Sequence, residues 1–271
     1  MKFVQNGAFR AGDSMRLWVV TLAAMALAAP SFGAAPSCTG EVEIGDAHIM
    51  RIEKNGVLVM TDGRALKLEG IRLPAGAQDH APQAIADRAF AELEALAKGR
   101  ELDARAVWPK EDRYDRVRSQ IFNADGTWLQ LELLKTGLAR VELSPDRGEC
   151  NRELYAAEFE AQKAKLGLWA EPAYATRSPD LLGGDTGTFQ IVIGRVLNTV
   201  AENGAVYLNF GPDWRTDFTV IIGAEDVQRF KTMGVDPLNY EGKLIRVRGV
   251  VQSANGPAIA VGNPKQIELL Q

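Results

Sequence analysis

The chain has 271 residues, of which 46% are hydrophobic and 24% are charged, and its formal net charge is −4. This is the composition of a soluble globular protein with room for one large domain or two small ones, and it excludes a disordered chain. An acidic protein does not attract nucleic acid as a whole, so any such contact would need a local basic patch.

The N-terminus has the pattern of an export signal. Arg10 and Arg16 precede the apolar run Leu17–Ala29, and small residues suited to cleavage follow this run. The run has 13 residues, whereas a membrane span needs roughly 20. We therefore expect residues 1–33 to be a cleaved signal peptide. The mature protein would be secreted or periplasmic without further membrane contact. A retained anchor and a true start at Met15 are the alternatives.

Two cysteines, Cys38 and Cys150, are the only ones in the chain. An even number of cysteines in an exported chain suggests a disulfide, and two free thiols are the alternative. The bond would tie the segment before the first strand to the start of the last helix of a first domain.

From residue 40 the pattern is three strands, a helix, two strands and two helices. Asn55-Gly56 and Asp62-Gly63 are tight-turn signals, and side chains alternate along Ala65–Ile71. The expected strands are Glu41–Met50, Arg51–Met60, Ala65–Ile71, Glu101–Trp108 and Val117–Phe122, and the expected helices are one that begins at Pro82, Leu129–Thr136 and Arg152–Leu166. This order predicts a five-stranded OB-type barrel with three helices packed on it.

The C-terminal third is almost all strand. Ser178–Thr188 is rich in Gly, Pro, Asp and Ser, so we place a linker at residues 176–188. The expected strands beyond it are Phe189–Thr199, Ala205–Phe210, Asp217–Ile222, Lys243–Gln252, Ala258–Val261 and Gln266–Leu269, with a short helix at Ala224–Met233. A helix between the third and fourth strands is the layout of an OB-fold. The predicted fold class is therefore α+β, mainly β, with a second small OB-like barrel at residues 189–271.

Three segments resemble the staphylococcal, thermonuclease-type nuclease family, and together they cover roughly residues 40–175. They are Lys54–Ala75, the stretch from Asp112 to Val141 with its D-R-Y-D-R strand and D-G turn, and Ala156–Trp169 with its G-L-W close. Residues 189–271 resemble OB-like domains that follow degenerate nuclease domains in exported bacterial proteins. The resemblance implies a thermonuclease-like domain at residues 40–175.

Most of the catalytic residues of that family are missing. In the family, two carboxylates hold Ca²⁺, two arginines bind the phosphate and a glutamate acts as general base. The matching positions here hold Gly56, Lys67, Arg72 and Ala75, and only Arg116 agrees with the family. The resemblance thus implies that the Ca²⁺ site is lost, with no metal or other cofactor. Lys67, Arg72 and Arg116 remain as candidates for binding phosphate or another anion.

Three functions remain open. The degenerate domain could bind nucleic acid or another polyanion, or it could bind a protein partner in the cell envelope. The enzymatic alternative is a phosphodiesterase that hydrolyses nucleic acid with non-standard acids, for which Glu69 and Asp79 are the candidates. His48 and His80, the only histidines, form no catalytic pattern with other residues, and a zinc site is not expected.

A second candidate surface lies in the C-terminal domain. OB-folds bind single strands with exposed aromatic and basic residues on one face. The residues that would form such a nucleic-acid face are Tyr207, Trp214, Arg215, Arg246 and Arg248. The alternative is that the aromatic side chains pack inside the barrel and that the arginines pair with nearby acids.

Overall fold

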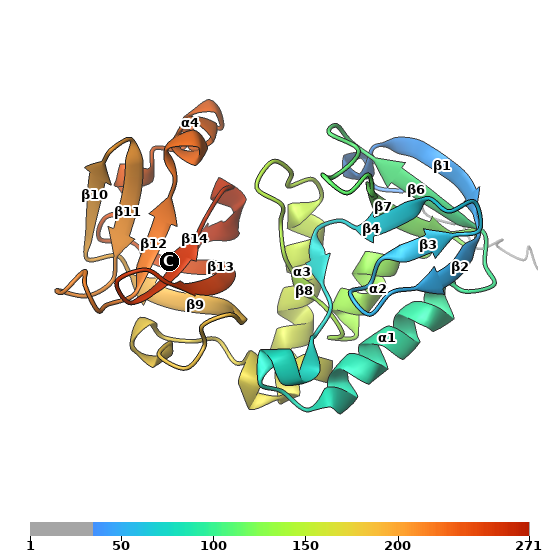
Figure 1. Cartoon of the computed structure of the whole chain (residues 1–271), viewed down its shortest axis with the longest axis horizontal. Coiled ribbons are helices and arrows are strands. Elements are labelled where there is room, and N and C mark those ends of the chain that lie inside the picture. Colours follow the sequence, from blue (N-terminus) through green and yellow to red (C-terminus); the bar gives the residue numbers. More distant parts are fainter. Residues whose placement is uncertain (1–34, 271) are drawn as a thin grey trace, which may run out of the picture. The chain divides into compact units, whose positions relative to one another are not determined.

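The structure is a computed structural model that describes residues 35–270. The expected signal peptide lies outside these residues. The described chain groups into one compact unit and contains two large β-sheets that follow one another along the sequence (Figure 1), together with a small two-stranded sheet. No helix among the described residues is both long enough and apolar enough to cross a membrane.

The first sheet has six strands in the order β1-β6-β7-β4-β3-β2. Their bounds are β1 Glu41–Ala47, β2 Ile49–Ile52, β3 Leu58–Met60, β4 Ala65–Leu68, β6 Leu102–Ala106 and β7 Val117–Asn123. β4 pairs with β7 in parallel and the other neighbours are antiparallel. Only His48 separates β1 from β2, so the two edges of the sheet meet at that residue. No strand pairing between these edges closes the expected barrel within residues 35–270.

Two local features of this sheet differ from the sequence-based expectation. The expected strand Arg51–Met60 is divided into β2 and β3, because the turn at Asn55-Gly56 lies inside it. After β4 the chain turns at Gly70, which has a φ of +86°, and forms the short strand β5 (Ile71–Arg72). β5 pairs with β8 (Arg140–Val141) in a separate two-stranded sheet. This pairing positions the loop at residues 73–82 that follows β5.

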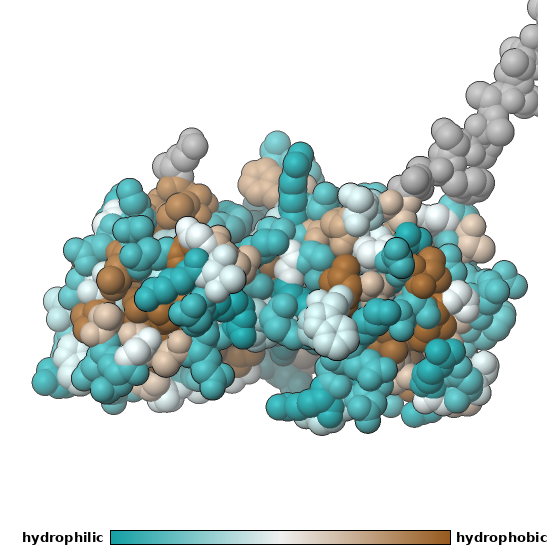
Figure 2. All heavy atoms as spheres, turned by 90° about the horizontal axis from the view of Figure 1, so that it is seen from above, coloured by the Kyte–Doolittle hydropathy of each residue, from teal (hydrophilic) through white to brown (hydrophobic). Residues whose placement is uncertain are grey.

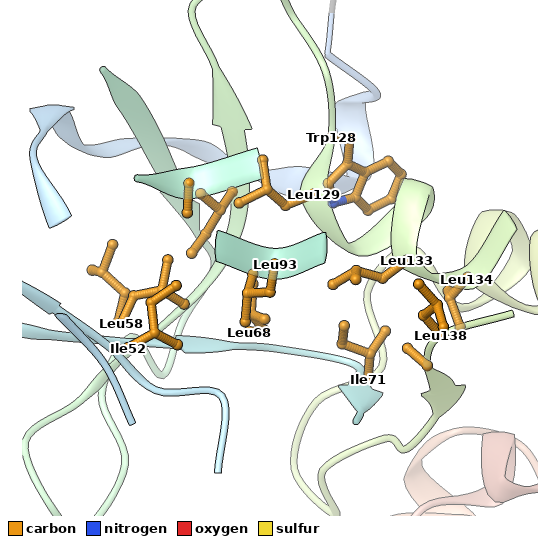
Figure 3. Packing of buried hydrophobic residues seen from close by; sticks show 14 of the residues in the cluster. Ile52, Leu58, Leu68, Ile71, Leu93, Trp128, Leu129, Leu133, Leu134 and Leu138 are labelled. Carbon is orange, nitrogen blue, oxygen red and sulfur yellow. The ribbon is translucent and has the colours of Figure 1, made fainter. Parts of the chain in front are cut away.

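Three helices cover the first sheet. They are α1 (Gln83–Ala97), α2 (Leu129–Lys135) and α3 (Asn151–Lys163). α1 buries Ile85, Ala89, Leu93 and Ala97, which recur at helical spacing and form one apolar stripe. In the core, Leu93 lies close to Leu68, and Leu129 and Leu133 point toward the strands (Figure 3).

A disulfide joins Cys38 to Cys150, as the sequence predicts. Cys38 lies in the short 3₁₀ helix Ser37–Thr39, and Cys150 directly precedes α3. The bond closes a loop with a sequence separation of 112 residues. In the chain-entropy model a loop of this length stabilises the fold by up to about 4–5 kcal/mol.

The second sheet repeats the topology of the first. Its strands are β9 (Phe189–Arg195), β10 (Asn198–Glu202), β11 (Ala205–Asn209), β12 (Thr219–Ile222), β13 (Leu244–Ser253), β14 (Pro257–Ala260) and β15 (Ile267–Leu269). The pairing order is β9-β13-β14-β12-β11-β10, again with one parallel pair, β12–β14, and β15 adds to β13. The helix α4 (Ala224–Thr232) follows β12, the fourth strand of this path, and α1 comes after β4, the fourth strand of the first path. This is the OB-type order that the sequence predicts.

The connection at residues 176–188 is packed against the protein. Leu182 is fully buried, Asp185 is buried, and Nε of Arg177 lies 3.0 Å from Oδ2 of Asp185. Buried side chains therefore anchor this connection at Leu182 and Asp185, while most of its other residues are exposed or half-buried. The domain limits at residues 40–175 and 189–271 stay a prediction. On the face that Figure 2 displays, hydrophilic residues predominate and apolar residues form small separate patches.

Candidate functional site

The turn at Gly56 lies beside the loop that follows β5. A Cβ atom added to Gly56 would lie 2.9 Å from Cδ1 of Leu73, and Gly56 has a φ of +82°. A side chain at this position would be strained and crowded. The family resemblance places the first Ca²⁺ carboxylate here, and this backbone leaves little room for one.

Arg72 stands where the resemblance places the second Ca²⁺ carboxylate. Its Nη1 atom lies 3.5 Å from Oε1 of Glu142, and its guanidinium carbon lies 5.6 Å from the ring centre of Phe189. Phe189 is the first residue of β9 and is buried. The C-terminal β domain therefore packs a side chain against this position. A fixed positive charge here repels a divalent cation.

Lys67 lies on β4 and Glu69 in the turn directly after it, and their charged groups are 3.7 Å apart. Glu69 is buried, and its Oε2 atom has no hydrogen-bond donor among the described residues. The β4–β7 register places Lys67 opposite Arg118. Glu69 thus lies beside two cations, Lys67 and Arg118, and is paired rather than free.

Arg116 is held by Asp112. Nε and Nη2 of Arg116 donate to Oδ2 of Asp112 at 2.8 and 2.6 Å. Burial raises the pKa of Asp112, but its hydrogen bonds with Arg116 and Tyr114 outweigh this and leave the pKa below its usual value. Asp112 is the one carboxylate paired with Arg116 within residues 35–270. The site would need at least two carboxylates near Arg116 to resemble a metal-dependent phosphodiesterase.

The three cations of the expected anion site are thus each paired with a different acid. The partners are Glu69 for Lys67, Glu142 for Arg72 and Asp112 for Arg116. No ion pair or hydrogen bond links the three cations to a common partner in the described part of the chain. An anion that bound to them would have to compete with these carboxylates.

Asp79, the other candidate acid, has a structural role. It is buried, and its Oδ2 atom accepts hydrogen bonds from the Ala75 amide at 2.8 Å, from Nη2 of Arg140 at 3.1 Å and from the Tyr174 hydroxyl at 3.0 Å. A carboxylate with three donors is not free to activate water. Asp79 therefore anchors the loop after β5, and Ala75 offers no side-chain base beside it.

The C-terminal residues of the expected nucleic-acid face separate into two groups. Arg248 is buried, with Nη1 2.7 Å from Oε2 of Glu158 and Nη2 2.8 Å from Oε1 of Glu268. Arg246 pairs with Glu268 at 3.2 Å. Placing Arg248 on an exposed face was wrong, because α3 of the N-terminal domain covers it. Arg246 and Arg248 both pair with nearby acids, which is the alternative stated in the sequence analysis.

Tyr207 and Trp214 do come together. Both line one hollow on the C-terminal sheet, and 52% of Trp214 is exposed. The guanidinium of Arg215 lies over the Trp214 ring at 4.8 Å and pairs with Asp213 at 3.7 Å. These aromatic residues therefore belong to a surface site and do not pack inside the sheet.

From residues 108–116 sequence reasoning selected only Arg116, and it placed Trp108 at the end of a strand, whereas β6 ends at Ala106 and the aromatic residues lie in a loop. Trp108 is 85% exposed and Tyr114 is 60% exposed. The guanidinium groups of Arg113 and Arg116 lie 4.8 and 4.9 Å from the Tyr114 ring centre. The available signal was the alternation of aromatic and basic residues in W-P-K-E-D-R-Y-D-R.

The backbone next to Trp108 is anchored by two arginine side chains. The carbonyl oxygen of Pro109 accepts hydrogen bonds from Nη2 of Arg118 and Nη1 of Arg147, both at 3.0 Å. Arg118 is itself fixed by two hydrogen bonds to Asp146, at 2.8 and 2.9 Å. The exposed indole is therefore presented on an anchored backbone.

The histidines and cysteines add no metal site. His48 and His80 are both exposed. Within residues 35–270, one group of His, Cys, Asp and Glu side chains lies close enough together to hold an ion: Cys38, Cys150 and Glu153. Its two sulfur atoms are joined in the disulfide, so it offers no thiolate ligands.

Residues 65–171 match a family model described as "Staphylococcal nuclease homologue". The part of the chain at residues 65–171 thus has the staphylococcal nuclease-like fold, and a C-terminal β domain follows it. No curated protein matches the chain.

Proposed function

We propose that the protein is an exported, nuclease-like binding protein that does not hydrolyse its ligand. The observation that carries this proposal is the placement of Arg72. A guanidinium group lies where the resemblance expects a Ca²⁺ ligand, and Glu142 and Phe189 fix it there. Ca²⁺ requires six to eight oxygen ligands. Gly56, Arg72 and Ala75 supply no side-chain oxygen, so these positions do not fit the ion.

The ligand of the N-terminal domain is a polyanion such as single-stranded nucleic acid, bound by the loop at residues 108–116. Exposed rings stack on bases, and arginines beside them neutralise phosphates. Trp108 and Tyr114 supply the rings. Arg113 has no ion-pair partner among the described residues, whereas Arg116 would have to leave Asp112. Because the net charge of the whole chain is −4, we expect moderate affinity and a strong dependence on salt.

Export is supported by two features of the chain. The first is the signal-like pattern of residues 1–33. The second is the Cys38–Cys150 disulfide, because such bonds persist in oxidising compartments. A secreted or periplasmic location accounts for both.

A labelled single-stranded oligonucleotide titrated with purified residues 34–271 tests the proposal through fluorescence anisotropy at 50 and 200 mM salt. We expect binding at low salt and at least tenfold weaker binding at the higher salt. Tyr114→Ala and Trp108→Ala should each weaken binding at least about fivefold, because loss of stacking on one base costs roughly 1–3 kcal/mol. Trp214→Ala is the matched control, an exposed tryptophan outside the loop, and should change little.

A protein partner is the second candidate, and the exposure of Trp108 favours it. A tryptophan that is 85% exposed beside an anchored backbone carbonyl is the type of residue that dominates binding energy in protein interfaces. Absence of oligonucleotide binding at low salt would reject the polyanion proposal. A partner of the cell envelope whose binding requires Trp108 would then remain.

A further inference from the structure

The outer face of β10, β11 and β12 carries a hollow of about 560 Å³. Because side chains alternate along a strand, the opposite face of the same strands holds the buried core residues Val206, Leu208 and Val220. The volume is within the range of small-molecule sites, roughly 300–1,000 Å³. The loops at residues 211–214 and 254–255 complete its wall.

Two rows of side chains form the floor of the hollow. The strand register places Val200, Tyr207 and Ile221 side by side in one row. Two residues away along each strand, and thus on the same face, it places Asn198, Asn209 and Thr219 side by side. All six residues line the hollow. The floor thus consists of an apolar row with one ring and a parallel polar row.

The polar row is ordered by its own hydrogen bonds. Nδ2 of Asn209 donates to Oδ1 of Asn198 at 2.9 Å, and the Thr219 hydroxyl donates to Oδ1 of Asn209 at 3.3 Å. No acceptor for Nδ2 of Asn198 is present among the described residues, and this side chain is exposed. An oriented amide therefore keeps two donors for a ligand. A purely apolar ligand would remove water from this row without replacing its hydrogen bonds.

The charge of the hollow disfavours a polyanion. Glu202 is the one charged residue that lines it, and its charge is negative. Arg215 lies nearby on the loop, but it covers the Trp214 ring and pairs with Asp213. A phosphate backbone would meet a carboxylate here without a facing cation, which is the opposite of the arrangement that binds single strands.

We infer that this hollow binds a neutral glycan. The C–H face of a sugar ring stacks on aromatic rings, which Tyr207 and Trp214 provide, and its hydroxyl groups exchange hydrogen bonds with amides and a carboxylate, which Asn198 and Glu202 provide. The site is separate from the loop at residues 108–116, so it does not depend on the function proposed for that loop. It also replaces the nucleic-acid role expected for Tyr207 and Trp214.

Isothermal titration calorimetry of residues 34–271 tests the inference. The probes are tetramers of β-1,4-linked glucose, α-1,4-linked glucose and β-1,4-linked N-acetylglucosamine, with a twelve-residue oligothymidylate as the polyanion. We expect at least one glycan to bind at one site per chain. Trp214→Ala and Asn198→Ala should each weaken that binding at least tenfold, and Trp108→Ala, the matched control, should leave it within twofold.

Two results would overturn the inference. One is that no glycan of the set binds. The other is that the oligothymidylate binds and Trp214→Ala abolishes this binding, which would assign the hollow to nucleic acid. Circular dichroism of each variant confirms that it is folded. Because Trp108→Ala and Trp214→Ala are expected to have reciprocal effects on the two ligands, failure of one proposal is distinguishable from failure of the other.

Discussion

Arg248 on β13 and Glu158 on α3 form a buried ion pair, with Nη1 2.7 Å from Oε2. The pair joins the C-terminal β domain to the last helix of the nuclease-like domain. Oε1 of Glu158 also accepts a hydrogen bond from the Val141 amide at 2.7 Å, so the same carboxylate holds β8. Through this contact the C-terminal domain lies against β5 and β8, where Phe189 stacks on Arg72.

Arg248→Met should reduce the free energy of unfolding by about 3–5 kcal/mol, because it leaves the buried Glu158 charge without its partner. Urea denaturation of residues 34–271 measures the change. Arg215→Met is the matched control, since Arg215 is exposed and pairs weakly with Asp213. It should change stability by less than about 0.5 kcal/mol. Equal effects of the two substitutions would show that the buried pair does not join the domains.

Asp79→Asn should lower stability by about 3 kcal/mol, because Arg140 would remain buried without a counter-charge. Burial already lowers the pKa of Arg140, and the Asp79 carboxylate opposes this shift. Asp87→Asn, on the exposed side of α1, is the control and should be close to neutral. If Asp79 were instead a catalytic acid, Asp79→Asn would abolish a measurable hydrolytic activity and leave stability unchanged.

Stability should fall in acid partly through Asp146. Hydrogen bonds from Arg118 hold the pKa of Asp146 below its usual value, which is about 3.9. A carboxyl group whose pKa is lower in the folded state stabilises the protein above its unfolded pKa, and it loses this contribution as the pH falls through the folded pKa. The wild type should therefore lose stability below about pH 4 more steeply than Asp146→Asn. Denaturation midpoints at pH 3, 4 and 6 measure the difference, and parallel curves would contradict the assignment.

Much of the fold could be predicted from the sequence because its signals are local. The turns at Asn55-Gly56 and Asp62-Gly63, the helical stripe of α1 and the placement of one helix after the third strand each depend on neighbours in the chain. The Cys38–Cys150 pairing could be predicted because no other cysteine was available. The parallel pairs β4–β7 and β12–β14, by contrast, are visible only in the structure.

The candidate site was less predictable because its state depends on contacts between distant residues. Arg246 and Arg248 alternate along β13 as expected, but the burial of Arg248 depends on α3, 90 residues away in sequence. Asp79 looked free because its donors, Arg140 and Tyr174, lie far along the chain. Conversely, the sequence shows that Trp108 is aromatic but gives no measure of its exposure.

The central claim is that the nuclease-like domain binds without cutting. The most direct measurement incubates labelled single-stranded DNA with residues 34–271, in Ca²⁺ or in chelator, and follows both anisotropy and fragment length on a denaturing gel. The account predicts salt-sensitive binding with intact DNA under both conditions. Fragments that form in Ca²⁺ and disappear with chelator would contradict it, and would show that acids other than those at positions 56, 72 and 75 hold the metal.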